Sequence, residues 1–208
     1  MALVTDLVSD VLVSAPEAPE PLVTRHYLRA VRTFCRSTGA WRDDLGVLFD
    51  GKTSDYAINV PLDSEAFDAS MCKVGDRVLG KASREQMLYR YRATASGRPQ
   101  VYRVSASRLI FAPDPAEDIS SNVVVTAWLR PVLSATNVPD ALVEEHHDEG
   151  FVPGALATLL LTPNAPWRDA DMAVYYLRKF DDYVARWRSV AADGGNTGVP
   201  RRVRYGGY

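Results

Sequence analysis

Two helix-like segments with similar endings enclose a long strand-like region, and this arrangement constrains the fold more than any other feature of the chain. The first segment, residues 34–41, carries an apolar helical stripe into a glycine and a tryptophan. The second, residues 154–169, runs from an apolar stretch into two prolines and a tryptophan. Between residues 45 and 130 the apolar side chains recur at every second position, a period that is typical of strands. The sequence therefore predicts helices packed together, with a β-rich insertion between them.

We predict an α+β fold: a helical bundle of three main helices with a β-rich insertion and an extended C-terminal arm. The chain has 208 residues, which is long enough to bury a conventional core. Prolines at positions 16, 19 and 21 interrupt a short helical pattern, so the first residues are expected to form an arm. The expected parts are an N-terminal arm over residues 1–21, the bundle over 22–44 and 131–192, the insertion over 45–130 and the tail over 193–208.

Turn signals divide the insertion into short elements. Ser83 opens a helical pattern inside it and is a residue type that can cap a helix. Strands are expected over residues 45–49, 56–60, 70–79, 102–111 and 123–129, and a short helix over residues 83–92.

A row of arginines accompanies the first helix of the predicted bundle. The apolar stripe of this helix is formed by Val23, Tyr27, Val31 and Phe34, and Gly39 can end the helix in the left-handed conformation. A second stripe of the same helix consists of Arg25, Arg29, Arg32 and Arg36.

Three interpretations are open for these arginines. They form a solvated face with local salt bridges, a contact onto acidic residues of a neighbouring subunit, or a surface that faces DNA phosphates. The formal net charge of -2 weighs against the third, because binding to phosphates needs a surplus of basic residues. The second interpretation needs an acidic surface, and the sequence offers one in Glu144, Glu145, Asp148 and Glu149. Arginine binds carboxylate bidentately, so it suits a contact that fixes the register of two subunits.

No catalytic, cofactor-binding or metal site is predicted. The sequence contains neither a glycine-rich phosphate-binding motif nor a Gly-x-Ser-x-Gly nucleophile motif. The adjacent His146 and His147 would point about 100° apart on a helix, which does not suit a single metal ion. Cys35 and Cys72 are expected to be reduced, buried thiols. The alternative, an enzyme that uses an Asp/Glu pair in the sheet, would need a deep polar cleft.

The last residues differ in composition from the rest of the chain. Residues 193–208 hold five glycines, three arginines and two tyrosines. Such a segment buries too little apolar surface to order by itself, and we expect it to order on a partner. No apolar run approaches the ~20 residues that a membrane-spanning helix needs, so no membrane contact is expected.

Several landmarks occur in one order that resembles the head-tail adaptor (connector ring) proteins of tailed bacteriophages. The resemblance covers about residues 20–190. No single landmark is diagnostic, and the set consists of residues 34–41, 56–61, 97–102, 109–115, 128–131 and 154–167.

The resemblance implies a structural virion protein, not an enzyme, that binds no cofactor. It implies a homo-oligomeric, usually dodecameric ring between the portal protein and the tail or nozzle proteins, which seals and guides the DNA exit channel. Genomic DNA would pass through the lumen without sequence-specific binding. The protein would be located in the neck of the virion, after assembly in the host cytoplasm. The carboxy-terminal arm would then bind the portal, with Arg201, Arg202, Arg204, Tyr205 and Tyr208 as the expected contacts.

Three alternatives remain beside the adaptor. One is a tail-completion or stopper protein of the same neck, which would bind tube protein in place of portal. The second is the enzyme described above. The third is a minor DNA-binding module, which predicts a steep salt dependence of duplex binding.

Overall fold

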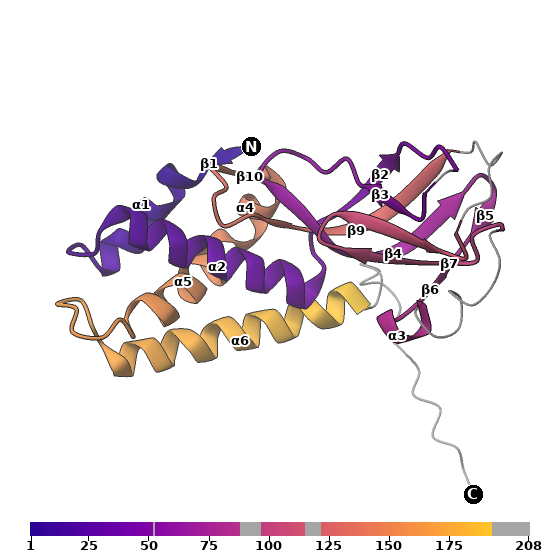
Figure 1. Cartoon of the computed structure of the whole chain (residues 1–208). Helices are drawn as coiled ribbons and strands as arrows, with labels where there is room; N and C mark the ends of the chain where they lie inside the picture. Colours follow the sequence, from indigo (N-terminus) through magenta and orange to yellow (C-terminus); the bar gives the residue numbers. More distant parts are fainter. Residues whose placement is uncertain (52, 88–96, 115–121, 193–208) are drawn as a thin grey trace, which may run out of the picture.

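The computed structural model describes residues 1–51, 53–87, 97–114 and 122–192. The molecule is elongated, with the helices at one end and two four-stranded sheets at the other (Figure 1). A continuous cluster of buried apolar side chains runs through both ends, from Val8 among the helices to Phe111 in the sheets. The two ends therefore share one core.

The first helix packs onto the helical region. Strand β1 (Ala2–Leu3) leads into α1 (Val4–Ser14) and pairs with β10 (Asn137–Val138). Valines recur at helical spacing on one side of α1 and are buried, and α1 contacts the next helix, α2 (Glu20–Thr38). The segment that we expected to be an arm thus contributes to the core.

Helix α2 follows the predicted pattern. Its four stripe residues, Val23, Tyr27, Val31 and Phe34, are all buried. Gly39 ends the helix with a φ of 64°, and its N–H donates a hydrogen bond of 2.8 Å to the Cys35 carbonyl.

The carboxy-terminal helical region begins with α4 (Asp140–His146), which continues into a π-helix, η2 (His147–Phe151), and then into α5 (Val152–Leu159). Pro153 lies in the first turn of α5. Proline cannot donate a backbone hydrogen bond and crowds the preceding turn, and a π-helical turn is one way in which a helix accommodates such a defect.

The last helix, α6 (Ala170–Ala192), lies along α5 and the lower side of the helical region (Figure 1). The carboxylate of Asp169 caps it by accepting a hydrogen bond of 3.0 Å from the Met172 N–H. Gly154 permits the close approach of α5, because a Cβ at this position would lie 2.8 Å from the Phe180 ring and 2.9 Å from the Cβ of Ala30.

The strands at the other end form two sheets. The first has the order β2 (Arg42–Val47), β9 (Val123–Pro131), β4 (Ser64–Val74) and β5 (Arg77–Val78). The second has the order β3 (Asp55–Ala57), β8 (Arg108–Ala112), β7 (Val101–Ser105) and β6 (Gly80–Lys81). Only the β6–β7 pair is parallel among the described strands.

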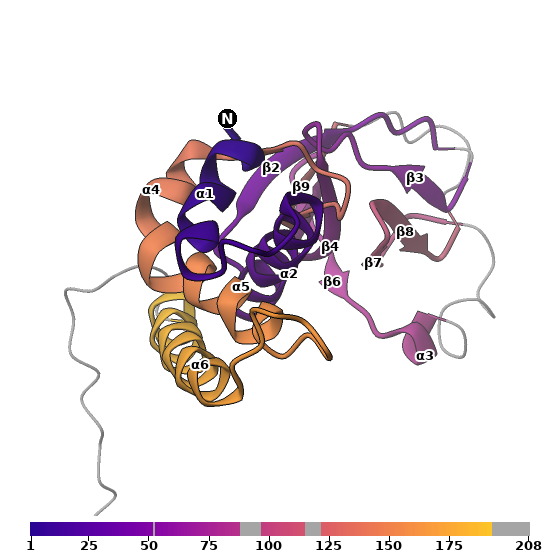
Figure 2. The same cartoon turned by 90° about the vertical axis from the view of Figure 1, so that its left-hand side faces the viewer.

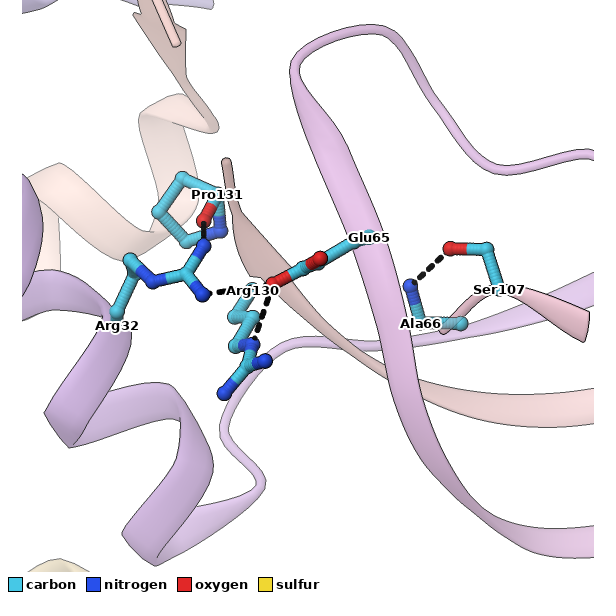
Figure 3. A network of polar contacts seen from close by, with 6 residues as sticks. All are labelled: Arg32, Glu65, Ala66, Ser107, Arg130 and Pro131. Carbon is cyan, nitrogen blue, oxygen red and sulfur yellow. Dashed lines mark hydrogen bonds and ion pairs between the residues drawn. The ribbon is translucent and has the colours of Figure 1, made fainter. Parts of the chain in front are cut away.

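The two sheets are joined through β4. Its register against β9 shifts twice, and such irregularities bend a strand. Ser107, at the turn between β7 and β8, donates its backbone N–H to the Ala66 carbonyl and accepts from the Ala66 N–H with its Oγ, each at 2.9 Å. Figure 3 draws the second of these bonds.

The predicted bundle of three main helices with a β-rich insertion is wrong. The described residues form an α+β fold with five helices of seven residues or more and three sheets. Two physical reasons account for the error. The prolines after α1 end that helix but do not release it from the core, and the π-helix with Pro153 divides the stretch from 140 to 159 into separate elements. The predicted extended arm over residues 193–208 lies outside the described residues.

The third sheet, β1 with β10, also lies in the helical region, outside the predicted insertion (Figure 1). The run 102–111, predicted as one strand, is the β7–β8 hairpin, which turns at Ala106 and Ser107 with positive φ values. Ser83 does cap a short helix, α3 (Arg84–Gln86), through a reciprocal capping box, whereas most of the predicted helix 83–92 lies outside the described residues. Cys35 and Cys72 are free and buried, as predicted.

Candidate functional site

One of the four arginines is bound inside the subunit. The guanidinium of Arg32 donates hydrogen bonds of 2.5 Å to the Pro131 carbonyl and 2.7 Å to the carboxylate of Glu65 (Figure 3). Arg130 donates a further hydrogen bond of 2.8 Å to the same oxygen of Glu65. Arg32 therefore ties α2 to β4 and β9.

The electrostatics of this cluster favour the ionised carboxylate. Burial by itself would raise the pKa of Glu65, but the hydrogen bonds and positive charges of Arg32 and Arg130 outweigh it, and the pKa lies below its usual value. A half-buried carboxylate between two guanidinium groups is a structural anchor.

The other three arginines are exposed. Arg25, Arg29 and Arg36 recur at helical spacing on α2. With 3.6 residues per turn, their positions lie about 160° to 200° around the helix from Tyr27. They form the arginine face.

The opposite side of α2 packs against η2. The ring of Tyr27 lies 6.0 Å from that of Phe151, and the ring of Phe34 lies 5.5 Å from it. The arginine face therefore points away from η2.

The four acidic residues belong to α4 and η2. Glu144 and Glu145 are exposed on α4, and Asp148 and Glu149 are exposed on η2. We call these four residues the acidic face. Figure 2 shows α4 at the outer margin of the helical region, while α2 lies beside the sheets. The arginine face and the acidic face thus point to different sides of the subunit.

Two residues of the acidic face have a basic side chain nearby. Glu149 forms an exposed ion pair of 3.7 Å with Arg186 of α6, and such a pair contributes little to stability. The carboxylate of Glu145 lies 3.8 Å from the Nε2 of His146. These contacts leave most of the acidic face open to solvent.

The two adjacent histidines point in different directions, as predicted. His146 is buried, and its Nδ1 lies 3.0 Å from the Tyr183 hydroxyl. Burial lowers the pKa of His146, against a smaller opposing effect of Glu145. His147 instead lies between Tyr27 and Asp10 of α1, at 2.8 Å from each. The contact with Asp10 was not predicted, because it joins positions 137 residues apart and no local sequence motif indicates it.

Neither of the two buried cysteines is activated as a nucleophile. Burial raises the pKa of both Cys35 and Cys72 to about 12, which disfavours the thiolate. The Nδ1 of His26 lies 2.7 Å from the hydroxyl of Thr158, but that hydroxyl donates to the Ala155 carbonyl of its own helix. Burial, with the charges of Arg29 and Arg25, lowers the pKa of His26.

A pocket lies between α2, α4 and α6. Its walls include Trp41, Leu142, His146 and Trp187. The hydroxyl of Thr38, which also lines it, donates to the Phe34 carbonyl and accepts from the Ala40 N–H. The lining thus offers apolar surface but no free nucleophile among the residues that the structure describes.

The five expected portal contacts lie outside the described residues; they are Arg201, Arg202, Arg204, Tyr205 and Tyr208. Comparison with protein-family models and with curated proteins found no match. Among the described residues, no helix is both long enough and apolar enough to span a bilayer.

Proposed function

We propose that this protein is a structural virion protein, a head-tail adaptor that forms a ring between the portal and the tail or nozzle proteins. In this proposal the ring is homo-oligomeric, and it seals and guides the DNA exit channel. The observation that carries the proposal is the placement of the arginine face and the acidic face on different sides of one subunit.

This placement suits a ring because a closed ring uses heterologous contacts. One surface of each subunit meets a different surface of the next, and the rotation between them closes the circle. Arg29 on α2 and Glu144 on α4 belong to two such surfaces. A two-fold symmetric dimer would instead need one surface that complements itself.

Exposed apolar residues on α6 add further support. Its amino-terminal half carries Met172, Val174, Tyr175 and Leu177 in exposed positions. These four residues lie within six consecutive positions of one helix, and exposed apolar patches commonly mark contacts with other chains. The ring proposal gives this surface a neighbour to contact.

Assembly with the portal protein tests the proposal. We expect the wild-type chain to form a ring, alone or with purified portal protein, as measured by light scattering and electron microscopy. The double variant R25E/R29E should reduce assembly at least about tenfold, since like charges would then face each other. Arg168, which is exposed outside the arginine face, provides the matched control R168E.

A charge exchange sharpens the test. Adding E144R and E145R to the double variant should restore part of the assembly. Normal ring formation by R25E/R29E would contradict the proposed contact between the arginine face and the acidic face. If the wild-type chain formed no ring with portal protein, the proposed adaptor function would be wrong. Binding to tube protein without binding to portal would favour the tail-completion or stopper alternative.

A further inference from the structure

Three metal-ligating side chains from two helical elements converge beside α2. They are Asp10 of α1 and the consecutive residues His147 and Asp148 of η2. One potential ligand atom of each lies within 4.8 Å of the others. Because Asp10 is remote in sequence, the convergence is a product of the packing of α1 on the helical region.

The imidazole at the centre of this group is held in place. Its side chain is only 11% exposed. The Nδ1 of His147 lies 2.8 Å from the hydroxyl of Tyr27, which belongs to a third helix and is itself buried. A hydrogen bond to the second ring nitrogen is the usual way in which a protein orients a metal-binding histidine. The Nε2 of His147 is thereby directed at the carboxylate of Asp10, 2.8 Å away.

The group contains two carboxylates, from Asp10 and Asp148, but only one N–H donor that faces them. The Nε2–H of His147 can donate one hydrogen bond on this side, and the carboxylate of Asp10 accepts it. Within the described part of the chain, the side chain of Asp148 forms neither a hydrogen bond nor an ion pair. Both carboxylates are open to solvent, so a cation can reach them.

We infer that Asp10, His147 and Asp148 bind a zinc-class divalent ion that ties α1 to η2. One imidazole nitrogen and two carboxylate oxygens match the ligands of zinc, with water in the remaining position. Ligand bonds of about 2.0–2.2 Å require donor atoms roughly 3–3.5 Å apart. Both aspartate side chains are exposed, so their rotation is the movement that would bring the ligand atoms to that separation.

Binding also changes the tautomer of His147. Without metal, the Tyr27 hydroxyl donates to Nδ1 and Nε2–H donates to Asp10. With metal on Nε2, the proton resides on Nδ1 and the Tyr27 oxygen accepts it. A hydroxyl can take either role, so the same contact serves both states.

The experiment uses the full chain without a histidine tag, freed of metal by a chelator. Calorimetry with Zn²⁺ should give one site per chain, and Co²⁺ should give visible absorption bands of a bound ion. A Zn²⁺ concentration about 100 times the dissociation constant should raise the Tm by roughly 5–10 °C. Mg²⁺ should bind far more weakly, because the site contains a nitrogen ligand.

Variants separate this site from adventitious binding. D148N should weaken Zn²⁺ binding at least about tenfold without loss of folding, because Asp148 is exposed and unpaired in the described structure. H147Q should abolish the Co²⁺ bands. The matched control E144Q, which changes an exposed acid on α4 outside the group, should leave binding unchanged.

Two results would overturn the inference: no stoichiometric binding by the wild-type chain, or equal binding by D148N and the wild type. Both measurements are made on the separate chain and do not depend on ring assembly. Failure of the metal site and failure of the proposed function are therefore distinguishable.

Discussion

A guanidinium nitrogen of Arg32 in α2 lies 2.7 Å from a carboxylate oxygen of Glu65 in β4. This ion pair connects the helical end of the molecule to its sheets. Their side chains are 19% and 28% exposed, so the pair is shielded from water on most sides. Of the four arginines of the stripe, this one has a fixed structural role within the subunit.

Replacing Arg32 with alanine should destabilise the fold by about 1–3 kcal/mol, because a half-buried carboxylate and the Pro131 carbonyl would each lose a donor. Urea unfolding of the two proteins measures the difference. The exposed Arg36 provides the matched control, and R36A should cost less than about 0.5 kcal/mol. Equal losses in the free energy of unfolding for R32A and R36A would show that the contacts of Arg32 with Glu65 and Pro131 do not stabilise the fold.

The stability of the protein should fall in acid partly through Glu65. Its pKa in the folded state is lowered below the usual value of 4.5, so its contribution is fully present above that value. The contribution is lost as the pH falls through the lowered pKa, because the protonated acid no longer attracts Arg32 and Arg130. Denaturant unfolding from about pH 6 to about pH 3 measures this slope. The slope should be smaller in E65Q, and an unchanged slope would contradict the assignment.

His146 should produce a second pH effect. Burial lowers its pKa below the usual value of 6.5, so folding favours the neutral ring. Its contribution to stability is present above 6.5 and is lost as the pH falls through the lowered pKa. In H146F the ring contacts with Phe34 and Trp187 can persist, and the stability should depend less on pH in this range. Because burial also lowers the pKa of His26, H26Q provides the comparison that separates the two histidines.

Substitution of Gly154 by valine should destabilise the helical region by about 1–3 kcal/mol, because the new atoms would meet the Phe180 ring and Ala30. Thermal unfolding measures the loss. Gly46 provides the control, since a Cβ added there would meet nothing within 4 Å. If G154V and G46A unfolded at the same temperature, the close approach of α5 would not matter for stability.

Local patterns predicted the parts of the fold that depend on neighbouring residues. The spacing of Tyr27 and Phe34 defined the buried side of α2, and Gly39 marked its end. Each of these signals acts within one or two helical turns, which is the range over which sequence spacing is informative.

Contacts between distant segments were not predictable from spacing. Nothing near Arg32 indicates that Glu65 and Pro131 will meet it, so the sequence pattern alone left it equivalent to Arg29. The turn at Ala106 and Ser107 has positive φ without glycine or asparagine, and thus lacks the usual signal. Asp10 reaches His147 only because α1 folds back onto the helices.

Strand β9 runs without a break from Val123 to Pro131, and its last carbonyl accepts the guanidinium of Arg32. A load applied to the first sheet would therefore pass along a hydrogen-bonded strand directly into α2.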